Sequence, residues 1–153
     1  MRIQPDDLTG PEIAALLQEH LNDMNVVSPP ESKHALDLTG LKASDISFWT
    51  IWQQQQLAGC VALKQLNSTQ GEIKSMRSAT AFRGQGIGKL LLQYVVSEAK
   101  NRGYQQLYLE TGAMDYFAPA RALYSSFGFE CCEPFAQYKA DPNSVFMCKQ
   151  LTV

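Results

Sequence analysis

A glycine-rich segment, Arg83-Gly84-Gln85-Gly86-Ile87-Gly88-Lys89, has the residue types and spacing of an anion-binding turn. It lies between a predicted strand and a predicted helix, so its backbone N–H groups can point at a phosphate near the N-terminus of that helix. The glycine spacing fits neither the Walker A loop nor the dinucleotide-binding fingerprint, which argues against ATP and NAD. A turn that only joins a strand to a helix remains the alternative.

The elements that must position this segment follow from the hydrophobic pattern, which alternates between strand and helix signals. No internal repeat or linker divides the chain, so we expect one domain spanning residues 1–153. We predict strands over residues 1–4, 47–53, 57–66, 72–78, 106–110, 129–132 and 144–151, and helices over 11–23, 86–101 and 119–127. Residues 31–44 show weak periodicity and read as a short helix or an irregular loop.

Composition and charge exclude several classes of protein. The 153 residues are 45% hydrophobic and 18% charged, which is typical of a globular domain. The formal charge of -2 provides no global attraction to nucleic acid. The N-terminus lacks a basic region followed by an apolar one, and no run of about 18 apolar residues occurs, so we expect no membrane partner and a cytoplasmic location.

The thiols and imidazoles indicate no metal site. Cys60, Cys131, Cys132 and Cys148 form no Cys-x-x-Cys pair, which favours reduced, structural thiols. His20 and His34 are the only histidines, too few for most zinc or catalytic-triad chemistry.

Two segments together resemble the GNAT superfamily of acyl-CoA-dependent N-acyltransferases. They are Arg83-x-x-Gly86-x-Gly88 and the later run Ala120-Arg121-Ala122-Leu123-Tyr124-Ser125-Ser126-Phe127-Gly128-Phe129. The 72–77 and 109–112 segments resemble the central strands of that family, and the order of elements fits nearly the whole chain. The resemblance implies an α/β (α+β) fold with a mixed, mostly antiparallel central sheet, flanking helices and splayed central strands.

The resemblance also implies acetyl-CoA as acyl donor, bound without a metal. Main-chain N–H groups of the glycine-rich turn would hold its pyrophosphate; the residues are Arg83, Gly84, Gln85, Gly86, Ile87, Gly88 and Lys89. The pantetheine arm would enter between the splayed strands and bond to backbone groups of Met76 and Ser78, with an N–H near Met76 directed at the thioester oxygen. Many relatives carry an asparagine where this chain has Phe117.

Two side chains match catalytic positions of the family. An alkyl amine with a pKa of about 10 must lose a proton before it attacks a thioester. Glu72 matches the strand position from which some relatives remove that proton, so we favour it as the base over Glu110, the competing carboxylate on the neighbouring strand. A structural salt bridge is the alternative for Glu72. Tyr124 stands where the general acid of the family protonates the departing thiolate, with a packed core tyrosine as the alternative.

The family selects its acceptor mostly through the segment after the first helix and through the last two strands. From these segments we expect Glu31, His34 and Tyr138 to bind substrate. The resulting prediction is direct acetyl transfer, in a ternary complex, to the primary amine of a small molecule or amino acid. Acetylation of a protein lysine or N-terminus, and a non-catalytic acyl-CoA-binding module, are the alternatives, and the sequence leaves a homodimer open.

Overall fold

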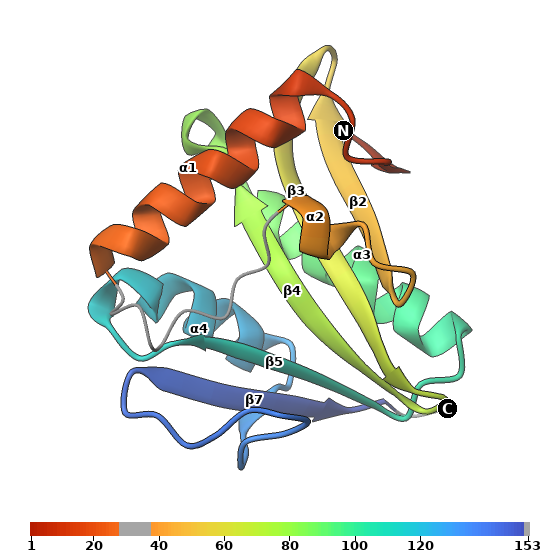
Figure 1. The fold of residues 1–153 in the computed structure, drawn as a ribbon, viewed down its shortest axis with the longest axis vertical. Coiled ribbons are helices and arrows are strands. Elements are labelled where there is room, and N and C mark those ends of the chain that lie inside the picture. Colours follow the sequence, from red (N-terminus) through yellow and green to blue (C-terminus); the bar gives the residue numbers. More distant parts are fainter. Residues whose placement is uncertain (28–37, 152–153) are drawn as a thin grey trace.

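The protein was analysed as a computed structural model that describes residues 1–27 and 38–151 (Figure 1). Its seven-stranded sheet has the order β1-β2-β3-β4-β5-β7-β6. The strands are β1 (Arg2–Pro5), β2 (Ile46–Gln53), β3 (Gln56–Asn67), β4 (Gln70–Ser78), β5 (Gln106–Gly112), β6 (Glu130–Cys131) and β7 (Ser144–Gln150). Each neighbouring pair is antiparallel except β4 and β5, which are parallel. The predicted mixed, mostly antiparallel sheet is therefore confirmed.

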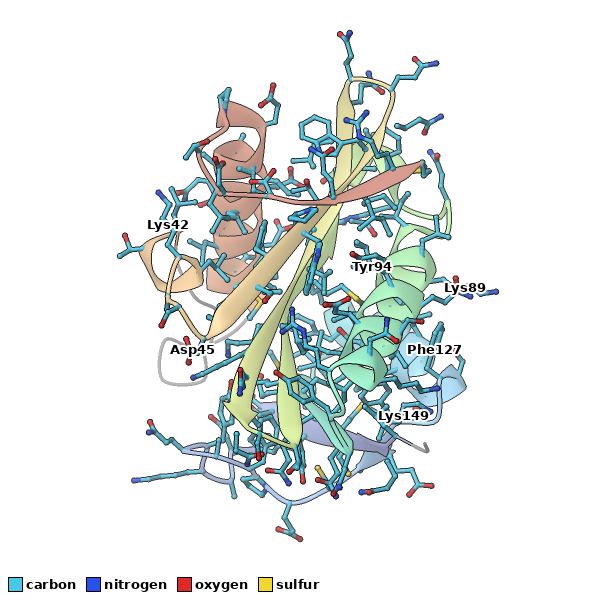
Figure 2. All side chains as sticks on the ribbon, turned by 90° about the vertical axis from the view of Figure 1, so that its right-hand side faces the viewer. Lys42, Asp45, Lys89, Tyr94, Phe127 and Lys149 are labelled. Atoms are coloured by element: carbon cyan, nitrogen blue, oxygen red, sulfur yellow. The ribbon has the colours of Figure 1, made fainter. Side chains whose placement is uncertain are left out.

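Helices cover both faces of the sheet. They are α1 (Pro11–Val27), α2 (Leu38–Leu41), α3 (Ile87–Asn101) and α4 (Ala118–Ser126), with single 3₁₀ turns η2 (Thr80–Phe82) and η3 (Asp115–Phe117). Figure 2 shows α1 and α3 on opposite sides of the sheet. None of the described helices has the length and apolar character that a membrane span requires.

Each face has its own apolar cluster. Under α1 and α2, the buried side chains of Ile13, Leu16, Leu17 and Leu41 pack on Phe48 and other residues of the sheet. The larger cluster on the other face contains α3 residues at helical spacing, namely Ile87, Leu91, Leu92, Val95, Val96 and Ala99. Ile87, Leu91, Val95 and Ala99 of this set belong to the pattern from which the sequence predicted α3.

The helix α1 continues past the predicted end at Asp23 to Val27. Within the predicted part of the helix, Arg77 Nη2 of β4 lies 2.6 Å from Glu19 Oε1 and 2.7 Å from Asp23 Oδ2. Two carboxylates one helical turn apart thus bind a single buried guanidinium, which ties α1 to the sheet. Helical periodicity could not predict this contact because it is tertiary.

The central strands diverge after a short parallel pairing. β4 and β5 pair from Gln70 opposite Gln106 to Ile73 opposite Leu109, and no pairing follows. Beyond this point β4 stays paired with β3, where the register shifts between Cys60 and Ala62, and β5 stays paired with β7. Ser75 of β4 has a φ of 53°, in the left-handed region, beside that shift. The predicted splay is confirmed.

Gly59 of β3 allows a close approach that fixes β4 and α3 near each other. A Cβ atom at Gly59 would lie 2.5 Å from the carbonyl oxygen of Arg77 and 2.9 Å from Ile87 Cγ2. The first neighbour is backbone, so it cannot rotate away.

We predict that Gly59→Ser lowers the free energy of unfolding by about 1–3 kcal/mol, because overpacking forces backbone shifts. Urea denaturation followed by circular dichroism measures this. The matched control is Gly10→Ser just before α1, where a Cβ would meet only the flexible end of Glu12 at 3.3 Å. The two variants losing equal stability would contradict the steric explanation.

Candidate active site

The glycine-rich turn has the geometry of an anion-binding site. Gly84 and Gly86 have φ values of 78° and 81°, and a Cβ atom at either would find no neighbour within 4 Å. In α3 the Leu90 N–H bonds back to the carbonyl of Gly86, so the N–H groups of residues 87–89 precede the first intrahelical bond. The first turn of α3 contains no acidic residue. Open space, free N–H groups and the positive helix end all suit the diphosphate of a coenzyme A ester.

The side chains of this turn differ in how far they are buried. Ile87 is buried in the core, whereas Lys89 is exposed and extends outward from the start of α3 (Figure 2). Gln85 is exposed, and its Nε2 lies 3.4 Å from the Ala81 carbonyl oxygen. Gly88 lets α3 approach α4, because a Cβ there would lie 3.1 Å from Leu123 Cδ2.

Arg83 is the one cation of the turn that already contacts a carboxylate in the described residues. Its Nη2 lies 3.3 Å from Asp23 Oδ2 of α1 and donates to the Tyr116 hydroxyl at 3.3 Å. Tyr116 in turn donates to Asp23 Oδ2 at 3.1 Å. Because the Arg83 side chain is 47% exposed, it can leave this contact at little energetic cost.

A cavity of about 120 Å³ occupies the gap between the splayed strands. Residues from α1, β4, β5, η3, α4 and the segment before β7 line it: His20, Met24, Glu72, Ile73, Lys74, Ser75, Met76, Glu110, Thr111, Gly112, Phe117, Ala120, Tyr124 and Tyr138. Met76 therefore lies on the wall, whereas Ser78 lies further along β4, opposite Gly59. Phe117 packs against Gly112 so closely that a Cβ there would lie 2.1 Å from the Phe117 ring.

Tyr124 reaches the cavity from α4 and is only 7% exposed. Its ring packs edge-on against Phe129, with centroids 6.0 Å apart. Burial, together with the nearby charge of Glu110, raises the pKa of Tyr124. The phenol therefore keeps its proton throughout the neutral pH range.

Glu72 is held in a buried hydrogen-bond network. The Lys74 ammonium lies 3.2 Å from Glu72 Oε2 and donates to the Tyr138 hydroxyl at 2.8 Å, and Tyr138 donates to Glu72 Oε2 at 2.5 Å. Glu72 is 2% exposed, so its charge depends on these two donors. Burial and the Glu72 charge raise the pKa of Tyr138, which keeps that hydroxyl protonated.

Glu110 lies on the wall of the same cavity in a different environment. Its carboxylate makes no hydrogen bond or ion pair with the described residues. Burial raises the pKa of Glu110 to about 7, with Lys74 opposing this shift and Glu72 and Asp141 adding to it. A carboxylate with this pKa can gain and lose a proton near neutrality.

A larger cavity of about 1090 Å³ adjoins the gap. Glu72, Lys74 and Tyr138 line both cavities, so they form the boundary between them. The aromatic rings of Tyr108 and Phe135 form part of its wall, with centroids 4.8 Å apart. Tyr138 thus lies beside Glu72 and Lys74, while Glu31 and His34 lie outside the described residues.

Sequence reasoning assigned no role to three groups at this site: His20, Lys74 and Arg77. His20 Nδ1 lies 3.5 Å from Arg77 Nη1, and burial and the Arg77 charge lower the pKa of His20 to about 4. Lys74 lies two residues after Glu72 on β4, and residues at this spacing share one face of a strand. This shared face was the only feature of the sequence that could have placed Lys74 at the site. The neighbours of His20 and Arg77 come from distant segments, and no local pattern indicates them.

Comparisons with known proteins agree with this geometry. The sequence profile described as the acetyltransferase (GNAT) family matches residues 13–129. The uncharacterized N-acetyltransferase YsnE of Bacillus subtilis is 54% identical over 99% of this chain and 100% of its own length. The IAA acetyltransferase of Azospirillum brasilense is 36% identical over 91% of this chain and 90% of its own.

A crystal structure of a Bacillus subtilis acetyltransferase in complex with CoA shares the fold. It has a TM-score of 0.74 and 20% identity and covers 99% of both chains. The family profile over most of the chain and the two relatives at 54% and 36% identity make the identity plain: the chain belongs to the acetyltransferase (GNAT) family and is an N-acetyltransferase that uses acetyl-CoA.

Proposed function

We propose that this enzyme acetylates the primary amine of a small molecule by direct attack, with Glu110 accepting a proton and Tyr124 donating one. The observation that carries the proposal is that Glu110 and Tyr124 line one cavity of about 120 Å³ in the gap between β4 and β5. The acceptor enters from the larger cavity, past Glu72, Lys74 and Tyr138. An internal space of this size suits a small amine better than a protein side chain on a flat surface.

The donor is held by the backbone. Acetyl-CoA supplies an activated acetyl thioester when bound. N–H groups of the 83–89 turn hold its diphosphate, and backbone groups of Met76 and Ser78 accompany its pantetheine arm between the splayed strands. The left-handed Ser75 turns the β4 backbone at this place, which frees an N–H near Met76 to stabilise negative charge on the thioester oxygen.

Glu110 is the better proton acceptor of the two carboxylates. The Glu72 carboxylate already accepts hydrogen bonds from Lys74 and Tyr138 and is nearly inaccessible to solvent. If Glu72 accepted the amine proton, this buried network would be disrupted. Glu110 has no such partner among the described residues, and its pKa of about 7 matches the working pH of a general base. This proposal reverses the preference for Glu72 drawn from the sequence.

Tyr124 then donates its proton to the sulfur that departs. The raised pKa keeps the phenol protonated until the C–S bond breaks, and the proton that Glu110 has gained from the amine replaces the one that passes to the sulfur, so no free phenolate builds up. The amine nitrogen loses a second proton, to solvent, as the amide forms, so Glu110 is again ionised and Tyr124 again protonated when the products leave.

We predict that Tyr124→Phe lowers kcat by about 100-fold or more while coenzyme A binding is retained, because only proton donation is lost. Steady-state thiol release and calorimetry with coenzyme A measure the two quantities. Tyr94→Phe is the matched control, since Tyr94 lies on α3 (Figure 2) and its ring packs against Trp49 instead of facing the cavity between β4 and β5. Unchanged kcat in Tyr124→Phe would remove Tyr124 from the mechanism.

We predict that kcat/KM rises with pH up to about 7 and then levels, because Glu110 must be ionised to accept the proton. Glu110→Gln should lower kcat/KM by about 100-fold or more and abolish this inflection. Glu98→Gln on the surface of α3 is the control. An inflection that survives in Glu110→Gln but disappears in Glu72→Gln would identify Glu72 as the base instead.

We predict that small primary amines, tested as a panel with acetyl-CoA, support release of free thiol, whereas lysine-containing peptides and folded proteins do not. The reason is the narrow gap that the amine must enter. Release confined to peptides would contradict a small-molecule acceptor, and the N-acetyltransferase activity itself would stand.

A further inference from the structure

Two hydrogen-bond donors in the gap take no part in the proton transfers described above. One is the imidazole of His20 on α1, and the other is the ammonium of Lys74 on β4; both line the cavity of about 120 Å³. Glu110 lines the same cavity, and its carboxylate, when ionised, accepts hydrogen bonds but cannot donate them. The cavity therefore offers donors and an acceptor to whatever enters it.

The proton of His20 is on Nε2. Its Nδ1 faces Arg77 Nη1 at 3.5 Å, and a guanidinium can only donate, so Nδ1 is the accepting nitrogen. With burial and the Arg77 charge lowering the pKa of His20 to about 4, the ring is neutral and carries one N–H, at Nε2. The described residues provide no hydrogen-bond partner for Nε2.

Arg77 fixes the orientation of this ring. Glu19 and Asp23 of α1 bind the Arg77 guanidinium at 2.6 and 2.7 Å, and His20 lies between them in the sequence. Arg77, itself bound by these two carboxylates, contacts the imidazole through Nδ1. The Nε2–H therefore has a defined place on the cavity wall.

Lys74 has a hydrogen bond to spare. An ammonium has three N–H donors, and the described contacts use two, to Glu72 Oε2 and to the Tyr138 hydroxyl. The ion pair with Glu72 balances the charge of Lys74 but leaves its third donor for a ligand. Lys74 stands at the boundary of the two cavities, where an entering acceptor must pass.

We propose that Lys74 and His20 select an acceptor that carries a carboxylate next to its amine, so that the substrate is a free amino acid. This inference rests on the proposed function above. The substrate ammonium approaches Glu110, the carboxylate accepts hydrogen bonds from Lys74 Nζ and His20 Nε2, and the side chain extends past Tyr138 into the cavity of about 1090 Å³. An amine without the carboxylate would leave both donors unpaired in a buried site, which is costly.

The first test compares matched pairs of acceptors with the wild-type enzyme. Alanine is paired with ethylamine, phenylalanine with 2-phenylethylamine and lysine with cadaverine, and kcat/KM is measured by thiol release from acetyl-CoA. We expect the amino acid of each pair to be preferred by about tenfold or more, the usual value of a charge-assisted hydrogen bond. Equal or better activity with the decarboxylated amines would overturn the inference and leave the proposed function intact. No thiol release with either member of any pair would overturn both.

The second test assigns the preference to residues. Lys74→Met and His20→Phe should each raise KM for the amino acid by about tenfold, with a much smaller effect on the decarboxylated amine. His20→Gln keeps an N–H donor and should restore part of the preference. Lys100→Met on the exposed end of α3 is the matched control for loss of a lysine.

Equal losses on both members of a pair in Lys74→Met would show a merely structural role for Lys74 and contradict its part in selection. The wild-type comparison decides the substrate class by itself, so it stands even if a variant fails to fold.

Discussion

The parallel pairing of β4 and β5 ends at Ile73 and Leu109, and the cavity that brings Glu110 and Tyr124 together depends on that ending. Were the two strands paired to their ends, their N–H and C=O groups would bind each other and no cavity would exist between them. β3 and β7 keep each strand in the sheet by its other edge, so the gap costs little stability. The left-handed Ser75 and the tight packing of Gly59 against β4 maintain the divergence from one side, and Phe117 packed on Gly112 does so from the other.

The gap brings together two glutamates with different environments. Lys74 balances the charge of Glu72, and Tyr138 donates a hydrogen bond to it. Glu110 has no direct partner among the described residues, and burial raises its pKa. One carboxylate thereby serves as a fixed anion that orients Lys74, and the other can exchange a proton near neutral pH. The two residues are of the same type, so their different roles come from the side chains that surround them.

Local signals in the sequence predicted most of the fold. The spacing of Ile87, Leu91, Val95 and Ala99 predicted α3, and the glycines before it predicted the turn, because both depend on residues close in the chain. The family resemblance identified Tyr124, which the structure brings to the gap.

The sequence could not predict contacts between distant segments. Tyr138 contacts Glu72 across 66 residues of the sequence, and Arg77 contacts His20 across 57. No local sequence pattern therefore indicates that Glu72 already has hydrogen-bond partners or how His20 is oriented. For the same reason the sequence favoured Glu72 as the base, since its strand position was visible while its partners were not. The contact of Arg77 with Glu19 and Asp23 likewise joins segments that are distant in the chain.

The most direct test of the divergent strands as the donor site is an NMR titration of the ¹⁵N-labelled protein with coenzyme A. We expect the amide signals of the 83–89 turn and of the β4 backbone around Met76 to shift together with a single affinity, while those of β1 and β2 stay in place. Shifts confined to another surface, with the turn and β4 unaffected, would contradict a donor site in the gap between β4 and β5.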